Sequence, residues 1–199
     1  FGPLVVAAVI VDDTTATKLQ AAGVKDCKML SDKKVLQLEE VIKENVVDSV
    51  VLELKPHIYN MRYEQVKAEG DNLNQLLGYG HVAALSQVLA KHLECKGALI
   101  DQFTKSNVII KSLQGKFPAM KFKQQPKAES DLAVAAASVL ARAKFLRSMD
   151  ELAVVAGEEE LPKGGGDLAT ECAKRIAVKL GKEALRNFVK LHFANYQKI

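Results

Sequence analysis

The chain has 199 residues, of which 48% are hydrophobic and 26% are charged. These values are close to ordinary globular usage, so disordered, collagen-like and coiled-coil rod proteins are excluded. The longest apolar run, residues 4–11, is far shorter than the roughly 20 residues of a membrane-spanning helix, which argues against a membrane protein. The formal net charge of +4 permits a polyanionic partner without requiring one. The length predicts one domain over residues 1–199.

The three cysteines, Cys27, Cys95 and Cys172, are odd in number and have no C-x-x-C spacing. This pattern argues against a disulfide framework and against a zinc ribbon, and it favours a reducing compartment. We expect the cytoplasm, with an organelle as the alternative. The sequence opens with Phe1 inside a strand-like run, so we expect further residues upstream, and no targeting peptide can be judged.

The first half of the chain predicts two strands around a helix. Residues 4–11 are apolar at consecutive positions and rich in β-branched residues, as in a strand covered on both faces. Ser31 is a suitable N-cap for an amphipathic helix that runs to about Asn45. Residues 49–54 read as a second strand. Residues 56–71 are polar and irregular, and no element is predicted for them.

The second half begins with a long helix, which Asn72 or Asn74 can cap and which runs to about Glu94. Two strands are predicted next, over residues 97–103 and 120–123.

A second long helix is predicted over residues 130–152, with a small-residue run near its start. Residues 162–166 (PKGGG) then break the chain, and two shorter helices are predicted over residues 169–180 and 182–191. Strands that alternate with helices indicate an α/β or α+β sheet domain, here with a C-terminal helical extension.

Two carboxylates are candidate site residues. Asp101 follows an apolar strand, where it could simply end the strand, but ligand sites in α/β sheets collect at the carboxyl ends of strands. Glu129 precedes a long helix, where the helix dipole stabilises a carboxylate in any case. The same field would keep Glu129 ionised, as a magnesium ligand must be.

The segment between these carboxylates, residues 102–128, contains six lysines and no acidic residue; the lysines are Lys105, Lys111, Lys116, Lys121, Lys123 and Lys127. It is either a solvated face or a cationic surface that attracts phosphates. Metal-dependent phosphodiester cleavage needs both features. Carboxylates hold two cations about 4 Å apart, and lysines position the strand without reading bases.

Several strings in the chain together resemble ribonuclease HIII, the bacterial type 2 branch of the ribonuclease H enzymes. They are FGPLVVAA from Phe1, VKDCKMLSDKK from Val24, NLNQLLGYGH from Asn72, LIDQF from Leu99, KAES with VAAASVLAR, LPKGGG from Leu161 and LHFANYQK from Leu191. They occur in the family's order from the first residue to the last. The helix signature is shared with ribonuclease HII, whereas KAE and LHFAN point to type III.

The resemblance implies a ribonuclease H-like mixed sheet of five strands flanked by helices. It also implies an endonuclease that uses two Mg²⁺ or Mn²⁺ ions to cut the RNA strand of RNA–DNA hybrids and leaves a 5′-phosphate. No small-molecule cofactor and a monomeric state are expected. Asp101 and Glu129 match two of the family's four carboxylates and would act as catalytic metal ligands. The other two belong to a D-E-x-G-x-G segment, which we expect immediately before Phe1 together with the first strand.

The family's N-terminal substrate-binding domain is also not visible in this sequence. Lys28, Lys105, Lys127, Lys163 and Gly164 are predicted to bind nucleic acid, although the glycine cluster could be an ordinary loop. Cys27 stands where the family commonly has serine, and a thiol is a weak replacement for a hydroxyl.

Two competing interpretations stay open. One is ribonuclease HII-like cleavage beside a single embedded ribonucleotide. The other is a catalytically inactive relative that serves as a subunit of a nucleoprotein assembly, which the absent acids and Cys27 would favour. The four histidines share no metal-ligand spacing, so no zinc site is expected.

Overall fold

The computed structural model describes residues 1–196 and 199. Contacts divide the chain into two compact units. The sheet unit contains residues 6–52 and 73–143, and the helical unit contains residues 1–5, 53–72 and 144–199. The single domain predicted for residues 1–199 stays a prediction. None of the helices that the structure describes combines the length and the apolar character that a membrane span requires.

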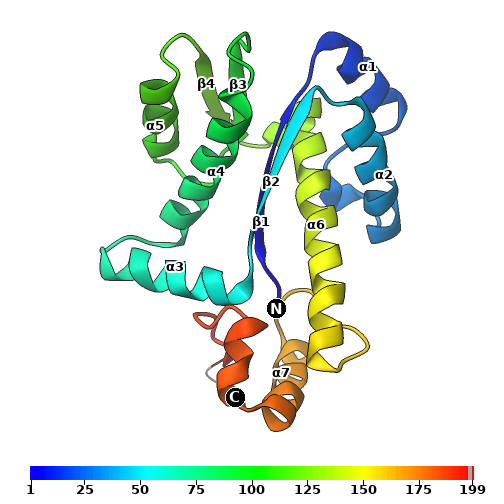
Figure 1. Cartoon of the computed structure of the whole chain (residues 1–199), viewed down its shortest axis with the longest axis vertical. Coiled ribbons are helices and arrows are strands. Elements are labelled where there is room, and N and C mark those ends of the chain that lie inside the picture. Colours follow the sequence, from blue (N-terminus) through cyan, green and yellow to red (C-terminus); the bar gives the residue numbers. More distant parts are fainter. Residues whose placement is uncertain (197–198) are drawn as a thin grey trace. The chain divides into compact units, whose positions relative to one another are not determined.

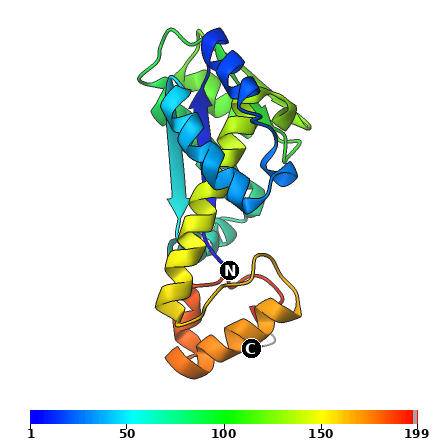
Figure 2. The same cartoon turned by 90° about the vertical axis from the view of Figure 1, so that its right-hand side faces the viewer.

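The first strand pair joins β1 (Leu4–Ile10) to β2 (Asp48–Leu54). The Val47 N–H donates to the Ile10 carbonyl at 3.1 Å, so β2 begins beside the end of β1. Figure 2 shows the two arrows running in opposite directions. Both strand predictions are therefore confirmed to within one residue.

Two helices connect β1 to β2, and only the second was predicted. Helix α2 (Asp32–Asn45) has the expected cap, since the Ser31 hydroxyl accepts from the Lys34 N–H at 3.3 Å. Helix α1 (Asp13–Ala21) is capped by Asp12, but it buries only Thr15 and Leu19. Its apolar stripe is therefore too narrow to produce a helical pattern in the sequence.

The second strand pair, β3 (Gly97–Asp101) and β4 (Lys121–Gln125), is parallel. Helix α5 (Val108–Lys116), which was not predicted, connects the two strands. Its Ile109 and Leu113 are buried against Ile100 of β3. Figure 1 shows α5, β4, β3 and α4 (Leu73–Leu89) next to one another in the sheet unit.

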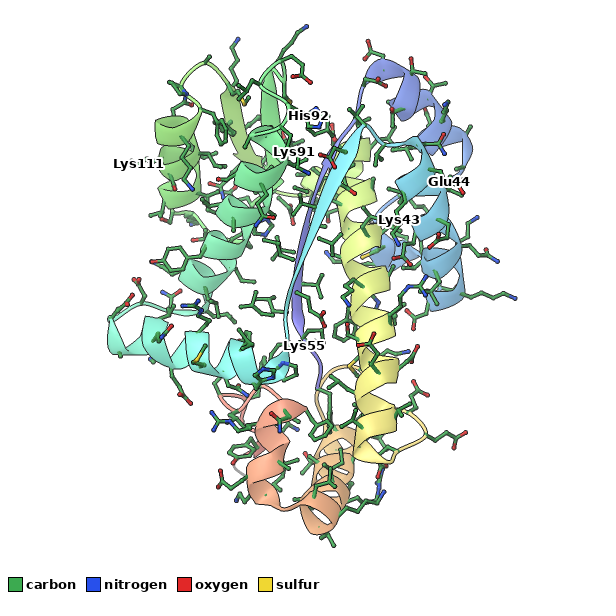
Figure 3. All side chains as sticks on the ribbon, viewed as in Figure 1. Lys43, Glu44, Lys55, Lys91, His92 and Lys111 are labelled. Atoms are coloured by element: carbon green, nitrogen blue, oxygen red, sulfur yellow. The ribbon has the colours of Figure 1, made fainter. Side chains whose placement is uncertain are left out.

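Helix α4 ends at Leu89, earlier than the predicted end at Glu94. The His92 N–H donates three residues back, to the Leu89 carbonyl, which tightens the chain out of the helix. The two ring nitrogens of His92 then lie 3.2 Å from Asp48 Oδ2 and 3.1 Å from Glu94 Oε1. Figure 3 labels His92 and its neighbour Lys91. The contact between His92 and Asp48 spans 44 positions, and a local pattern cannot encode it.

The helical unit contains α3 (Pro56–Ala68), α7 (Asp167–Leu180), the short η3 helix (Lys182–Asn187) and part of α6 (Leu132–Ala156). The predicted helices near α6, α7 and η3 are confirmed with shifted ends, whereas α3 lies in the segment without a prediction. Asn60 ties α3 to the C-terminal segment. Its side chain donates to the Val189 carbonyl at 2.9 Å and accepts from the Leu191 N–H at 2.9 Å.

The α/β class with a helical C-terminal part is confirmed. In the described residues, however, the strands form two separate two-stranded sheets, β1–β2 and β3–β4, and not the single sheet of five strands that was expected.

Candidate carboxylate site

The last residue of β3 carries the first candidate ligand. Asp101 Oδ1 accepts a hydrogen bond from the Ala128 N–H at 3.1 Å. Ala128 begins the short η2 helix (Ala128–Ser130), and Glu129 is the next residue. The hydrogen bond therefore joins the end of β3 to the segment that carries Glu129, although the two acids are far apart in the sequence.

The side chain of Glu129 is 23% exposed and retains unused hydrogen-bonding capacity. Oε1 lies 3.8 Å from Lys28 Nζ, whereas Oε2 is buried and has no hydrogen-bond partner in the described part of the chain. A buried carboxylate oxygen without a donor is unfavourable. A hard divalent cation would satisfy it, because Mg²⁺ and Mn²⁺ prefer carboxylate oxygens.

The loop that carries Lys28 is fixed by two hydrogen bonds. Asp26 accepts from the Lys28 N–H at 3.0 Å, and the Cys27 N–H donates to Ser138 Oγ at 3.2 Å. The Ser138 hydroxyl in turn donates to the Ala135 carbonyl at 2.8 Å. Ser138 is the serine of the VAAASVLAR signature. The string was recognised as a family motif, but no role was predicted for its serine.

His81 of α4 lies close enough to Asp101 for an electrostatic effect, and its ring stacks on Phe103 with 5.1 Å between centroids. Burial lowers the pKa of His81, and the opposing effect of Asp101 does not restore it. The lowered pKa favours the neutral form of the imidazole. The sequence left His81 without a functional role, and only the structure places it near a candidate ligand.

The predicted nucleic-acid-binding residues divide between the two units. Lys28, Lys105 and Lys127 are exposed or half-exposed in the sheet unit, which also contains the two acids. Lys163 and Gly164 belong to the helical unit, where Lys163 Nζ lies 3.5 Å from Glu160 Oε1. The sheet unit alone therefore brings together Lys28, Asp101 and Glu129.

The chemistry of the site follows from these donors. Asp101 and Glu129 offer hard oxygen ligands, and Lys28 offers a positive charge beside them. Within residues 1–196 and 199, no group of three or more histidines, cysteines or acids is arranged to hold a metal ion. The residues present fit a divalent cation but supply only part of a coordination shell.

The chain is similar over its full length to proteins named ribonuclease HIII. It is 37% identical over 199 residues to that of Protochlamydia amoebophila and 39% identical over 203 residues to that of Bacillus cereus. It covers 64% and 63% of these two proteins, so it spans less than two thirds of the curated relatives it matches.

Solved structures agree with this similarity. The crystal structure of Bst-RNase HIII in complex with Mn²⁺ matches with a TM-score of 0.87 and 34% identity, over 100% of this chain and 64% of the other. An RNase H3 of Aquifex aeolicus matches with a TM-score of 0.77 and 29% identity, over 96% and 66%. A sequence model of the family described as Ribonuclease HII matches residues 1–196. The chain therefore belongs to the ribonuclease HII family.

Proposed function

We propose that this chain is the catalytic part of an endoribonuclease that cleaves the RNA strand of RNA–DNA hybrids and leaves a 5′-phosphate. The observation that carries the proposal is the pairing of Asp101 with the Glu129 segment, together with the partnerless oxygen of Glu129. The similarity to proteins named ribonuclease HIII over the whole chain supports it.

Asp101 and Glu129 would be ligands of Mg²⁺ or Mn²⁺, and the full reaction would use two such ions. When bound in such a site, divalent ions supply an activated water and neutralise charge on the leaving oxygen. The Mn²⁺ complex of Bst-RNase HIII supports the choice of metal.

The protein would hold its substrate mainly through phosphates. Lys28 would bind a phosphate beside the carboxylates. Lys105 and Lys127 of the sheet unit would bind phosphates as well, and Lys163 and Gly164 are separate candidates in the helical unit. Such contacts position a duplex but do not read its bases. Selection of RNA over DNA would rest on the 2′-hydroxyl and on groove shape.

The test is cleavage of a labelled hybrid by the whole protein that contains this chain, with and without Mg²⁺ or Mn²⁺. The Asp101→Asn variant should lose at least about 100-fold in rate, because a metal ligand contributes several kcal/mol to the transition state. The matched control is Glu151→Gln, an exposed acid of α6. Metal-independent cleavage, or an unchanged rate in Asp101→Asn, would contradict the proposal.

A second candidate function is cleavage beside a single embedded ribonucleotide. The family model that matches this chain is described as Ribonuclease HII, which favours this activity. A duplex with one ribonucleotide and a duplex with a run of several separate the two activities. We expect efficient cleavage of the run, and preferential cleavage of the single site would support the second candidate.

A third candidate is an inactive subunit of a nucleoprotein assembly, which the thiol of Cys27, in place of the serine hydroxyl common in the family, favours. It predicts binding of the hybrid without cleavage under every metal condition. Three further properties stay predictions: that the protein is a monomer, that it is cytoplasmic and that it needs no small-molecule cofactor.

A further inference from the structure

Four of the six lysines between Asp101 and Glu129 separate into two pairs on the two sides of the β3–β4 sheet. Side chains alternate between the faces of a sheet, and paired positions on neighbouring strands share a face. The register pairs Gly97 with Lys121, Leu99 with Lys123 and Asp101 with Gln125. Lys121 and Lys123 therefore lie on the same face as Asp101.

Helix α5 covers the opposite face. Ile100 of β3 and Phe122 of β4 belong to a core cluster with Ile109 and Leu113 of α5. Lys111 and Lys116 are exposed on this covering helix, and Lys111 is labelled in Figure 3. Lys111 and Lys116 therefore carry the same charge as Lys121 and Lys123 but lie on the other side of the sheet, so they are a matched control for that pair.

Lys121 and Lys123 are both exposed, and neither is in an ion pair with an acid in the part of the chain that the structure describes. A strand rises about 3.3 Å per residue, so Lys123 lies about 7 Å and Lys121 about 13 Å from the level of Asp101 along the strands. Successive nucleotides of one strand of B-form DNA are about 3.4 Å apart along the duplex axis, so these steps correspond to about two and four nucleotides of such a duplex.

We propose that Lys121 and Lys123 bind the backbone phosphates of the nucleic acid on one side of the bond that is cut. The proposal rests on the proposed function for its substrate, and it adds the residues and the face of the sheet that bind the flanking duplex. The competing explanation is that lysines on an edge strand only prevent pairing with other chains. If the lysines only prevent such pairing, their replacement should not change the salt dependence of nucleic-acid binding.

The experiment measures binding of a fluorescent RNA–DNA hybrid to the whole protein by anisotropy, without divalent metal, from 50 to 200 mM salt. It compares the wild type with the double variant Lys121→Gln/Lys123→Gln. The control is Lys111→Gln/Lys116→Gln, which removes the same charge from α5. Thermal unfolding of each variant verifies that it is folded. The rate of cleavage with divalent metal is recorded in parallel over a range of hybrid concentrations, so that kcat and KM are obtained separately.

We expect the plot of log affinity against log salt to become shallower by close to two in the first variant, because each phosphate contact contributes about 0.9 to the slope. The control should retain the wild-type slope, and KM should rise more than kcat falls in the first variant. Equal slopes in the two double variants would overturn the proposal even if the protein cleaves hybrids. Binding that depends on Lys121 and Lys123 in a protein that cleaves no hybrid would overturn the proposed function. The same result would support the assignment of these two lysines as phosphate-binding residues.

Discussion

Glu129 of the sheet unit and Glu158 of the helical unit have opposite environments. Glu158 Oε2 accepts from Arg175 Nη2 at 2.7 Å, and its Oε1 accepts from Lys179 Nζ at 2.8 Å. Glu129 has one ion pair at 3.8 Å and a buried oxygen without a partner among the described residues. Both oxygens of Glu158 therefore have charged partners within the fold, whereas Oε2 of Glu129 retains hydrogen-bonding capacity that a ligand could use.

The strongest contrast should come from Glu129→Gln. We expect cleavage of the hybrid to fall at least about 100-fold, because a metal ligand is lost. The melting temperature should change little, since Oε2 makes no hydrogen bond that the substitution could break. Rate and melting temperature are measured on the same preparation. A large fall in melting temperature with an unchanged cleavage rate would show that Glu129, like Glu158, serves the stability of the fold and is not a metal ligand.

Gly97→Ala tests the strand pair that presents Asp101. A Cβ at Gly97 would collide with the Lys121 carbonyl, so β3 and β4 would have to separate. We expect the free energy of unfolding to fall by about 1–3 kcal/mol, as for other overpacked sites. Gly115→Ala in α5 is the control, because its Cβ would meet nothing within 4 Å. Urea denaturation that gives the same stability for both variants would refute this packing.

Glu158→Gln should affect stability in a pH-dependent way and leave cleavage at pH 7 intact. Hydrogen bonds from Arg175 and Lys179 lower the pKa of Glu158 from 4.5 to about 2. A carboxylate with a lowered pKa contributes stability above its unfolded pKa, and this contribution is lost as the pH falls from 4.5 toward 2.

The melting temperatures of wild type and Glu158→Gln should therefore differ at pH 7 and converge near pH 2. A difference that is constant over this range would show that the carboxylate charge is not responsible.

The smallest effect is expected from Ser138→Ala, which removes the acceptor for the Cys27 N–H. A hydrogen bond contributes about 1 kcal/mol net, so the affinity for the hybrid should fall by about fivefold as the Lys28 loop loosens. Thr17→Ala, which removes an exposed hydroxyl bond to the Asp13 carbonyl in α1, is the control. Affinity for the hybrid is measured by anisotropy. Equal affinities for the two variants would show that Ser138 has no role in substrate binding.

Caps and apolar spacing in the sequence predicted the helices whose buried residues are apolar and regularly spaced, such as α2. Val35, Leu38 and Ile42 of α2 are almost fully buried behind the Ser31 cap, as their spacing indicated. Helix α3 gave no such signal because one of its buried residues is the polar Asn60. Asn60 is buried for its hydrogen bonds to residues more than 120 positions away, and a local pattern cannot reveal these.

The candidate site shows the same limit. The end of an apolar strand made Asp101 a candidate ligand, and the start of a helix made Glu129 one. The approach of Asp101 to the segment that carries Glu129 depends on a hydrogen bond across 27 positions and on the left-handed backbone of Lys127, with φ at 56°. A lysine carries no local preference for that conformation, so the geometry could not be derived from the pattern.

The most direct test is Mn²⁺ binding to the whole protein, measured by calorimetry for the wild type, Asp101→Asn, Glu129→Gln and the double variant. Two ligands of one ion are coupled, so we expect each single substitution to weaken binding at least about tenfold and the double variant to lose less than the sum of the two. Binding that is unchanged in both single variants, or losses that are strictly additive, would contradict a shared cation between Asp101 and Glu129.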